Sequence, residues 1–327
     1  MIWRAARSVG QYGLVLAVLI VLNFVIPRAA PGDVVDYLFP PDQGGQLTPE
    51  QRREILSPYG LEKPTTEQFR VYVAGLARGD LGYSVRYGRP VADLVKEKIG
   101  WTALLVGGSI VLSTILGALL GFRSAWRRGT SRDAGMLSAV MAVDSMPAFF
   151  VGMLLILIFS VRLQWFPIFG ALPMEDMTGL ALAGDALKRL VLPLSTLTLV
   201  HVGGVYLVSR SALVSELQED YVLMAQAKGL TDRQVRRHAQ RNALLPVSTV
   251  TLISVAGLVG GATVVETVFS YPGLGSFIYQ SVLARDYPAL QGAFFLLAVC
   301  VLVVNFVNEL VYPVLDPRVR RPRPVTS

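Results

Sequence analysis

Charged residues are scarce in this sequence. They make up 16% of its 327 residues, whereas an average soluble domain contains about 25%. Because charged side chains cover the surface of a soluble protein, this shortage excludes an ordinary water-soluble protein. The single cysteine, Cys300, excludes a secreted domain held together by disulfides. Hydrophobic residues make up 53% of the chain, which excludes a disordered protein and leaves an integral membrane protein.

The signature motifs of several enzyme classes are also missing. No Gly-Lys dipeptide occurs, although a nucleotide-binding P-loop needs one to hold phosphates. Neither the HExxH pattern of metalloproteases nor the G-x-S-x-G pattern of serine hydrolases is present. If the chain takes part in an ATP-driven process, hydrolysis must therefore take place on another chain.

Six stretches are apolar over about 20 residues, which is the length that a helix needs to cross a bilayer. Each stretch contains at most one titratable acid or histidine. We therefore predict an all-α integral membrane protein with six transmembrane helices. The predicted spans are residues 8–27, 101–122, 135–161, 190–208, 247–269 and 290–315. The first follows Arg4 and Arg7 and lacks a good cleavage site, so we expect an uncleaved signal-anchor helix.

Basic residues indicate how these spans are oriented. If both termini are cytoplasmic, the inner segments hold 16 basic and six acidic residues, and the short outer loops hold four basic ones. Basic residues favour the cytoplasmic side, so we predict cytoplasmic N- and C-termini. The long outer segment, residues 28–100, holds equal numbers of both signs. The net charge of +7 thus reflects membrane topology, and we expect lipids rather than nucleic acid as partners.

The outer segment is predicted to be helical. Thr48-Pro-Glu-Gln51 and Thr65-Thr-Glu-Gln68 both have the capping-box pattern that starts a helix. The second of these helices should end at Gly79. A third amphipathic segment begins at Pro90 and leads into the second span. The outer segment is either a cap on the membrane surface or a docking surface for an outside partner, and the two interpretations are compatible.

The segment between the fourth and fifth spans has the most informative pattern. Acidic residues precede Tyr221, and the pair Lys228-Gly229 favours the end of a helix. Thr231-Asp232 then predicts the start of a second, arginine-rich helix. Ala225 and Ala227 leave room for another surface to approach closely. We therefore predict a helix–turn–helix outside the membrane, with a basic, lipid-binding helix pair as the alternative.

This segment resembles the "EAA" loop of ABC-importer permeases. The matching residues are Asp220-Tyr221, Ala225-Gln-Ala-Lys-Gly229-Leu230 and Arg241-Asn-Ala-Leu-Leu-Pro246. Further motifs follow the order of the dipeptide/oligopeptide/nickel branch from residue 31 to residue 318. They are Pro31-Gly-Asp33, Tyr59-Gly-Leu-Glu-Lys-Pro64, Gly79-Asp-Leu-Gly-Tyr-Ser84, Ser145-Met-Pro147, Phe269-Ser-Tyr-Pro-Gly-Leu-Gly275, Arg285-Asp-Tyr-Pro288 and Asp316-Pro-Arg318.

The resemblance implies a type I ABC-importer permease fold in the bacterial inner membrane, with a cytoplasmic coupling-helix loop. The implied partners are a second homologous permease (a heterodimer being favoured), two ATPase subunits that bind ATP and Mg²⁺, and an extracytoplasmic solute-binding protein. The chain itself is expected to be no enzyme and to hold no cofactor or metal. The implied cargo is a peptide or a related small solute. The implied ATPase-coupling residues are Tyr221, Ala225, Ala227, Lys228, Gly229 and Leu230.

Other classes of function stay open at this point. An ion-gradient-driven secondary transporter would need no ATPase, and a membrane scaffold or receptor would transport nothing. An intramembrane protease would need paired catalytic groups at one depth, which the sequence supports least.

Charged residues inside spans are functional candidates by default. Asp144 precedes Ser145-Met-Pro147, where a proline can kink the helix. His201 and Glu266 lie in the fourth and fifth spans. Asp144, Ser145, His201 and Glu266 are therefore candidates for a translocation pathway, although for Asp144 and His201 we favour the alternative, pairing or packing with a neighbouring helix.

The chain is thus expected to have three regions. Residues 1–100 are the first span and the outer segment, and residues 101–315 are the membrane core, which includes the coupling loop at residues 210–246. Residues 316–327 are a basic cytoplasmic tail.

Overall fold

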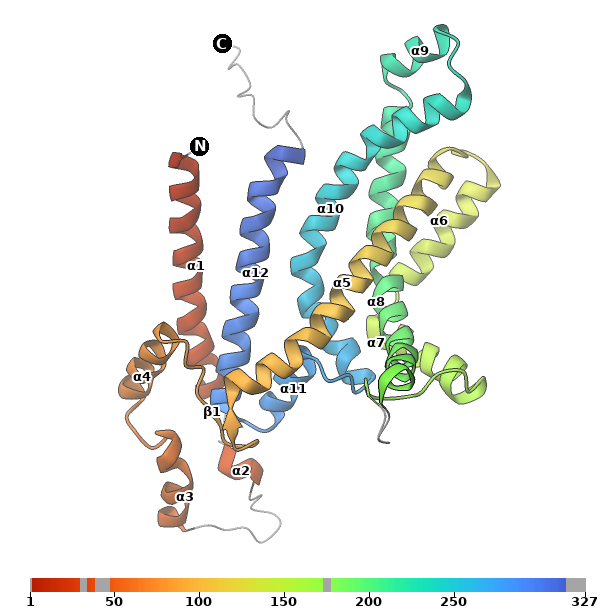
Figure 1. Cartoon of the computed structure of the whole chain (residues 1–327). Coiled ribbons are helices and arrows are strands. Elements are labelled where there is room, and N and C mark those ends of the chain that lie inside the picture. Colours follow the sequence, from red (N-terminus) through yellow and green to blue (C-terminus); the bar gives the residue numbers. More distant parts are fainter. Residues whose placement is uncertain (1, 30–33, 39–47, 173–177, 316–327) are drawn as a thin grey trace. The chain divides into compact units, whose positions relative to one another are not determined.

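A computed structural model of the chain describes residues 2–29, 34–38, 48–172 and 178–315. The side chains of residues 2–9, 34, 38, 256–261 and 310–315 lie outside this description. Helices dominate the described chain, and its sheet is a short two-stranded hairpin, which confirms the all-α prediction (Figure 1). The elements are α1 (Ile2–Ala29), α2 (Val34–Leu38), α3 (Pro49–Leu56), η2 (Ser57–Tyr59), α4 (Thr65–Ala77), β1 (Tyr83–Ser84), β2 (Arg89–Pro90), α5 (Val91–Ala125), α6 (Ser131–Asp144), α7 (Ala148–Leu155), η3 (Ile156–Arg162), α8 (Gly179–Glu216), α9 (Asp220–Ala227), α10 (Asp232–Val268), α11 (Leu274–Leu283) and α12 (Tyr287–Leu315).

Several of these helices are long and apolar enough to cross a membrane. Among the described residues there are four, in α1, α5, α8 and α12, and a bent pair formed by α6 and by α7 with η3 can count as a fifth. The predicted span at residues 247–269 lies in α10, and residues 256–261 within it have no described side chains. Six spans therefore stay a prediction.

The prediction of a single span at residues 135–161 is wrong. This segment is not one helix, because α6 ends at Asp144, α7 begins at Ala148, and the two halves differ in direction by 99°. Pro147 has no backbone N–H and disfavours a helical conformation at Met146. The proline therefore ends α6, where the sequence predicted a kink in a continuous helix.

The chain divides into two compact units. These units do not test the three predicted regions, which stay a prediction. The first unit comprises Met1–Thr102 and Pro272–Val303, and the second comprises Ala103–Tyr271 and Val304–Ser327. The boundary in α5 falls after Thr102, so this helix contributes to both units.

In the first unit, α4 and α12 are tied to the end of α1. The Asn23 side chain donates to the Tyr72 hydroxyl (3.0 Å) and to the Gln291 carbonyl (2.8 Å). The Phe24 and Phe69 rings meet edge to face at 5.0 Å. Side chains distant in sequence thus hold three helices together, and Figure 1 shows α3 and α4 gathered at one end of α1.

The hairpin of the first unit is anchored to α12 by a buried acid. Asp286 is fully buried and accepts hydrogen bonds from the Ser84 hydroxyl (2.5 Å) and the Arg86 backbone N–H (3.0 Å). It also accepts from the N–H of Ala289 in the first turn of α12 (3.2 Å). A carboxylate with charge-assisted bonds at a helix N-terminus is stabilising, so Asp286 joins the hairpin to α12.

Both helix starts predicted in the outer segment are confirmed, but the capping box forms at only one of them. Thr48 caps α3 with both bonds of the capping box to Gln51, and Pro49 is the first helical residue. At the second site the cap is Pro64, and no side chain completes a capping box there. The Gln68 amide instead donates to the Leu61 and Lys63 carbonyls, so it is drawn away from the helix start. As predicted, α4 ends just before Gly79, whose φ is +76°.

In the second unit, α5 crosses α8 at very close range. A Cβ on Gly121 would lie 2.6 Å from the Tyr206 carbonyl oxygen, and a Cβ on Gly117 would lie 2.7 Å from the Cβ of Val205. The spacing of the two glycines is the small-xxx-small pattern that lets helix backbones approach in membranes. A buried core that includes Phe122, Leu213 and Val247 extends this contact toward α10.

Candidate functional site

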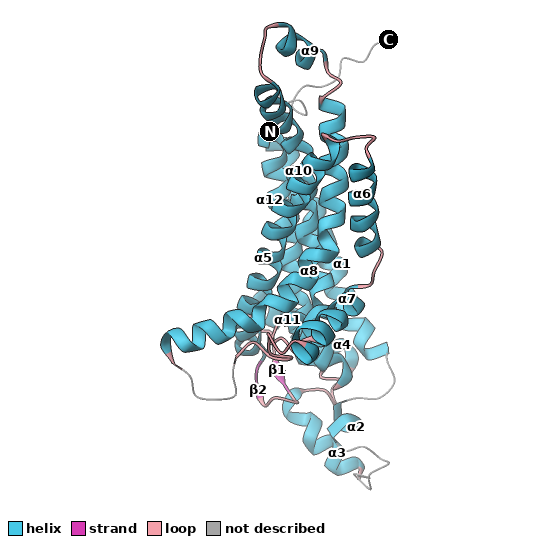
Figure 2. Cartoon of the chain, turned by 90° about the vertical axis from the view of Figure 1, so that its right-hand side faces the viewer, coloured by secondary structure: helices cyan, strands magenta, loops and turns pink. Residues whose placement is uncertain are grey.

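The α9 loop, defined here as residues 217–231, is carried on the ends of two long helices. Figures 1 and 2 both place α9 where α8 ends and α10 begins. The N–H of Gly229 donates to the Gln226 carbonyl (2.9 Å), and the N–H of Leu230 donates to the Ala225 carbonyl (3.2 Å). Together with a φ of +78° at Gly229, these bonds form a Schellman cap. The sequence pattern Lys228-Gly229 predicted this helix end, and the prediction is confirmed.

The start of the next helix is equally well defined. Thr231 caps α10 through a capping box with Gln234, whose side-chain oxygen accepts from the Thr231 N–H at 2.8 Å. The predicted Thr231 cap is confirmed. The arginine-rich helix that it starts is continuous with the predicted span, because α10 is one helix of 37 residues. A displacement of α9 at this end would therefore act directly on a membrane helix.

Glu216 joins the three helices at the α9 loop. Its carboxylate, at the end of α8, accepts hydrogen bonds from the Tyr221 hydroxyl of α9 (2.6 Å) and from the Asn242 amide of α10 (3.3 Å). Burial raises the pKa of Tyr221 to about 12, and the bond to Glu216 acts in the same direction. Tyr221 therefore stays a neutral donor at physiological pH, and α9 is tied to both long helices.

The outward face of α9 carries large apolar side chains beside the polar Gln226. Val222 is buried, whereas Leu223 and Met224 are 74% and 63% exposed. Ala227 lies one turn after Leu223, so small and large apolar groups share this face. An exposed apolar face on a helix outside the predicted spans is typical of a protein-binding surface.

The structure brings together the six residues predicted for coupling. All lie in α9 or its cap: Ala227, Lys228 and Gly229 are exposed, and Tyr221, Ala225 and Leu230 are half-buried. Leu223 and Met224 were not among the predicted residues. The available signal was a pair of large apolar residues between charged ones, in a segment too short to be a span.

The base of this site is held by a buried ion pair. Arg210 of α8 forms two hydrogen bonds with Asp133 of α6, at 2.9 and 2.7 Å. Asp133 also accepts from the Ser124 hydroxyl and from the Gly129 N–H (3.2 Å). Ser124 in turn bonds to the Tyr206 hydroxyl at 2.7 Å. This network joins α5, α6 and α8 close to their ends nearest the α9 loop.

A cation–π contact completes the support. The Arg236 guanidinium of α10 lies 3.9 Å from the ring centroid of Trp126, which follows α5. Tryptophan is the most favourable ring for such a contact, and arginine is the commoner cation. The first turns of α10 are thus fastened to the loop between α5 and α6.

The residues predicted for a pathway occupy different environments. Asp144 is exposed at the end of α6 and lies so close to Gly203 of α8 that a Cβ on this glycine would overlap the Asp144 carboxyl group. The Ser145 hydroxyl donates to the Met141 carbonyl (2.8 Å). His201 is half-buried, with Nδ1 2.8 Å from the Leu197 carbonyl oxygen. Glu266 is fully buried. A pathway role for these four residues stays a prediction.

Metal ligands do not gather in the described part of the chain, where no group of three or more His, Cys, Asp or Glu side chains could hold an ion. The geometry of the α9 loop instead suits mechanical contact with another protein.

Comparisons with known proteins agree with this geometry. Residues 113–321 match the family model described as "Binding-protein-dependent transport system inner membrane component". The di/tripeptide transport system permease protein DppB of Pseudomonas aeruginosa (strain UCBPP-PA14) is 36% identical over 92% of this chain and 94% of its own length. The oligopeptide transport system permease protein AppB of Bacillus subtilis (strain 168) is 33% identical over 91% and 93%. The dipeptide transport system permease protein DppB of Escherichia coli (strain K12) is 33% identical over 95% and 97%.

These matches cover almost the whole chain and include the α9 loop. They identify a transport component of an ATP-driven importer that works with a solute-binding protein and an ATPase, so the secondary-transporter alternative finds no support. The assignment as a transport subunit also agrees with the expectation that the chain is not an enzyme. The chain belongs to the family of inner membrane components of binding-protein-dependent transport systems.

Proposed function

We propose that this permease imports peptides, that it pairs with a second, homologous permease, and that the pair binds two ATPase subunits through the α9 loops. The relatives with 33–36% identity are named for the transport of di- and tripeptides, dipeptides and oligopeptides. ATP and Mg²⁺ would bind on the ATPases, since this sequence has no Gly-Lys dipeptide for a P-loop.

The proposed orientation places both termini and the α9 loop in the cytoplasm. Basic residues around α9 and after α5 support it, because they favour the cytoplasmic side. The α3–α4 segment, defined as residues 48–90, would then lie outside, where the solute-binding protein arrives. Basic side chains at the inner ends of the helices would also contact anionic lipid.

One observation carries the proposed coupling role. The outward face of α9 exposes the large apolar side chains of Leu223 and Met224, while its inward face is fastened to both neighbouring helices through Glu216. A protein that binds this face and moves must therefore move α8 and α10 as well. ATP-driven closure of two ATPase subunits would displace α9 in this way and open the pathway alternately to each side.

The break between α6 and α7 supports a pathway at that point. Non-helical backbone at membrane depth is tolerated where it is buried or lines a cavity, and discontinuous helices form substrate sites in transporters. Asp144 is exposed at the break, with Ser145 next to it. We propose that Asp144 contacts the cargo. In this proposal His201 lies on the neighbouring helix α8, and Glu266 stabilises the fold from within α10.

Co-purification tests the assembly. The tagged chain, extracted from its native membranes in a mild detergent, should bring down two ATPase chains and a second permease. Recovery of the chain alone, from membranes where uptake is active, would contradict the proposal.

Uptake by the reconstituted complex tests the coupling role. Ala225→Glu and Gly229→Asp should abolish peptide uptake and the ATPase activity that depends on transport, while the chain still inserts into the membrane. Ser131→Glu adds the same charge at the exposed first residue of α6, outside the α9 loop, and serves as the control. Normal coupled ATPase activity in both variants would overturn the role of α9.

A further inference from the structure

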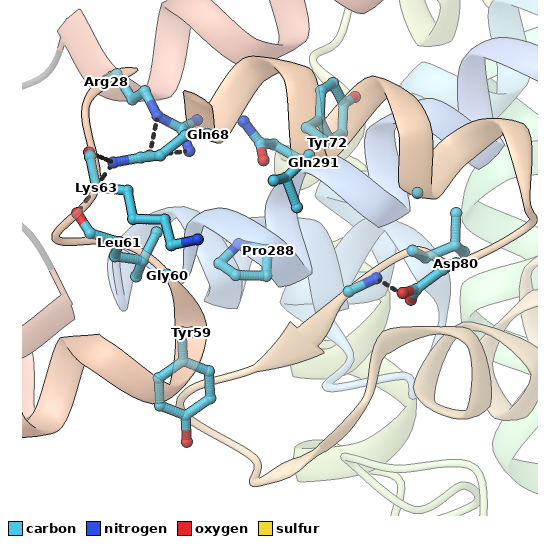
Figure 3. Close-up of a pocket in the computed structure, with 14 residues that line it drawn as sticks. Arg28, Tyr59, Gly60, Leu61, Lys63, Gln68, Tyr72, Asp80, Pro288 and Gln291 are labelled. Atoms are coloured by element: carbon cyan, nitrogen blue, oxygen red, sulfur yellow. Dashed lines mark hydrogen bonds between the residues drawn. The ribbon is translucent and has the colours of Figure 1, made fainter. Parts of the chain in front are cut away.

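A pocket in the first unit has no role in the function described so far. It has a volume of about 170 Å³. Its walls come from the end of α1, from α4, from the turns before and after α4, and from the start of α12 (Figure 3). All these parts belong to one compact unit, so their relative positions are defined by contacts within it.

One wall of the pocket is a preorganised guanidinium. Nε and Nη2 of Arg28 donate to Gln68 Oε1 at 3.1 and 2.8 Å, and Nη1 donates to the Phe24 carbonyl at 3.1 Å. The guanidinium also lies 3.7 Å from the centroid of the Phe24 ring. Arginine has five N–H donors, and these bonds use three of them. The remaining two have no partner among the described residues.

Gln68 holds the guanidinium in place and is itself held. Its amide nitrogen donates to the Leu61 carbonyl (3.0 Å) and to the Lys63 carbonyl (2.8 Å). Its oxygen is therefore oriented toward Arg28, as Figure 3 shows. This arrangement explains why Gln68 does not complete the capping box that the sequence predicted.

A second donor on the same pocket lacks an acceptor. Gln291 lines the pocket and is 4% exposed, and its Nε2 has no hydrogen-bond partner in the described structure. A buried polar donor without an acceptor costs about 1–3 kcal/mol. The amide ends a side chain with rotatable torsions, so a small turn would present Nε2 to an acceptor in the pocket.

The charges of the pocket favour an anion. Arg28 and Lys63 are cationic, and Asp80 is the one acid among the lining residues. Lys63 is exposed and paired with Glu67 at 2.9 Å, so it contributes less than Arg28. Asp80 already accepts from the Gly82 N–H (2.9 Å). A carboxylate is the ligand group that satisfies a guanidinium fork with two parallel hydrogen bonds.

The size of the pocket points to a side chain rather than a free peptide. Ligand pockets usually measure about 300–1,000 Å³, well above the 170 Å³ found here. A single anchoring side chain that fills a pocket is a common feature of protein interfaces. We therefore propose that this pocket receives the carboxylate of an aspartate or glutamate side chain on the solute-binding protein. This inference rests on the proposed function, which places the pocket on the outer side.

Binding of the purified solute-binding protein to the complete transporter in lipid nanodiscs tests the inference. Gln291→Leu should weaken binding roughly tenfold, and Arg28→Met should weaken it at least as much, as expected for interface anchors. Arg28→Lys keeps the charge but loses the fork, so it should lie between wild type and Arg28→Met. Arg53→Met removes an exposed arginine of α3 outside the pocket and should leave binding unchanged.

The outcomes separate the inference from the proposed function. If the wild-type complex fails to bind the solute-binding protein, the proposed function fails. If wild type binds and all pocket variants bind equally well, the pocket inference alone is overturned, and water is its occupant. Thermal unfolding of each variant identifies any that are misfolded. If Arg28→Met is misfolded, Arg28→Lys and Gln291→Leu carry the test.

Two further measurements identify the occupant. Free glutarate at millimolar concentration should compete weakly with the binding protein. If glutarate binds in the pocket but has no effect on binding of the solute-binding protein, the inference is overturned in favour of a small-molecule site. Lysine substitutions at exposed acids of the solute-binding protein should weaken binding at one position, and Arg28→Glu should restore binding to that variant alone.

Discussion

The α9 loop and the α3–α4 segment both lie outside the membrane-spanning parts of the chain, yet they are built differently. The α9 loop is short, its cap is made by backbone hydrogen bonds, and it exposes two large apolar side chains, Leu223 and Met224. The α3–α4 segment is longer and is held to α1 and α12 by polar side chains such as Asn23 and Asp286. Together with α1 and α12 it lines a pocket in which the Gln291 Nε2 has no hydrogen-bond partner among the described residues.

This difference indicates two kinds of contact. A short helix with an apolar face, fastened to two membrane helices, suits a partner that stays bound and pushes. A polar pocket with spare donors suits a partner that docks and leaves, because charge complementarity favours fast and specific association. The comparison predicts that substitutions near α9 change coupling, whereas substitutions in the other segment change binding.

Removing the buried acid that supports each region, Asp133 for the α9 loop and Asp286 for the α3–α4 segment, should have the largest effect and should separate the two roles. Asp133→Ala leaves Arg210 without its partner and should cost about 3 kcal/mol, the lower end for a broken buried pair because the Arg210 side chain is 23% exposed. Asp286→Ala removes the acceptor of three hydrogen bonds in the first unit. Thermal unfolding should show a lower midpoint for both.

The functional readouts of these two variants should differ. Asp133→Ala should reduce the ATPase activity that accompanies transport, and Asp286→Ala should reduce the response to the solute-binding protein. Identical functional profiles for the two variants would contradict the distinction between the regions.

A single methyl group should test the helix crossing beneath the α9 loop. Gly121→Ala places a Cβ 2.6 Å from the Tyr206 carbonyl oxygen, so α5 and α8 must separate. Overpacking of this kind costs about 1–3 kcal/mol. Gly107→Ala makes the same change in the same helix where nothing lies within 4 Å, and it should be neutral. Equal unfolding temperatures for the two variants would show that the crossing is looser than described.

Removing the hydroxyl of Tyr221 should have the smallest effect on stability, and this effect should depend on pH in a defined way. Tyr221→Phe removes the bond to Glu216 and should cost about 1 kcal/mol. In the folded chain the pKa of Tyr221 is raised to about 12, above the usual value of about 10. The stabilisation is therefore complete below about pH 10 and is lost as the pH rises toward 12. The free energy of unfolding should be measured for wild type and Tyr221→Phe between about pH 7 and pH 11. The difference between the two should be constant up to about pH 9.5. A difference that falls with pH in the neutral range would contradict this.

Local patterns predicted most of the helical structure. Thr48, Thr231 and Gly229 act through residues within a few positions, so the sequence alone predicts where helices start and end at these points. The second capping box failed because Gln68 bonds to Arg28, 40 positions away, which no local pattern reveals. The break after Asp144 was underestimated, because a proline signals a kink but not the 99° change in direction.

Site residues that are close in sequence were predicted, whereas those joined by long-range contacts were not. The six coupling residues came from a resemblance that spans one continuous segment. The ion pair of Asp133 with Arg210 joins residues 77 positions apart, and the pocket joins Arg28 to Gln291. Such contacts depend on how helices pack, and one sequence without relatives does not contain that information.

Cross-linking at α9 tests the central claim most directly. Leu223→Cys, in a chain whose only native cysteine is changed by Cys300→Ser, places one thiol on the exposed face of α9. In native membranes a benzophenone maleimide attached to the thiol of Leu223→Cys should, on irradiation, cross-link to an ATPase chain, while the same label on Leu180→Cys, at a position 92% exposed at the start of α8, should not. Failure of Leu223→Cys to cross-link in membranes that retain full uptake, or equal cross-linking from both positions, would contradict the assignment of α9 as the ATPase contact.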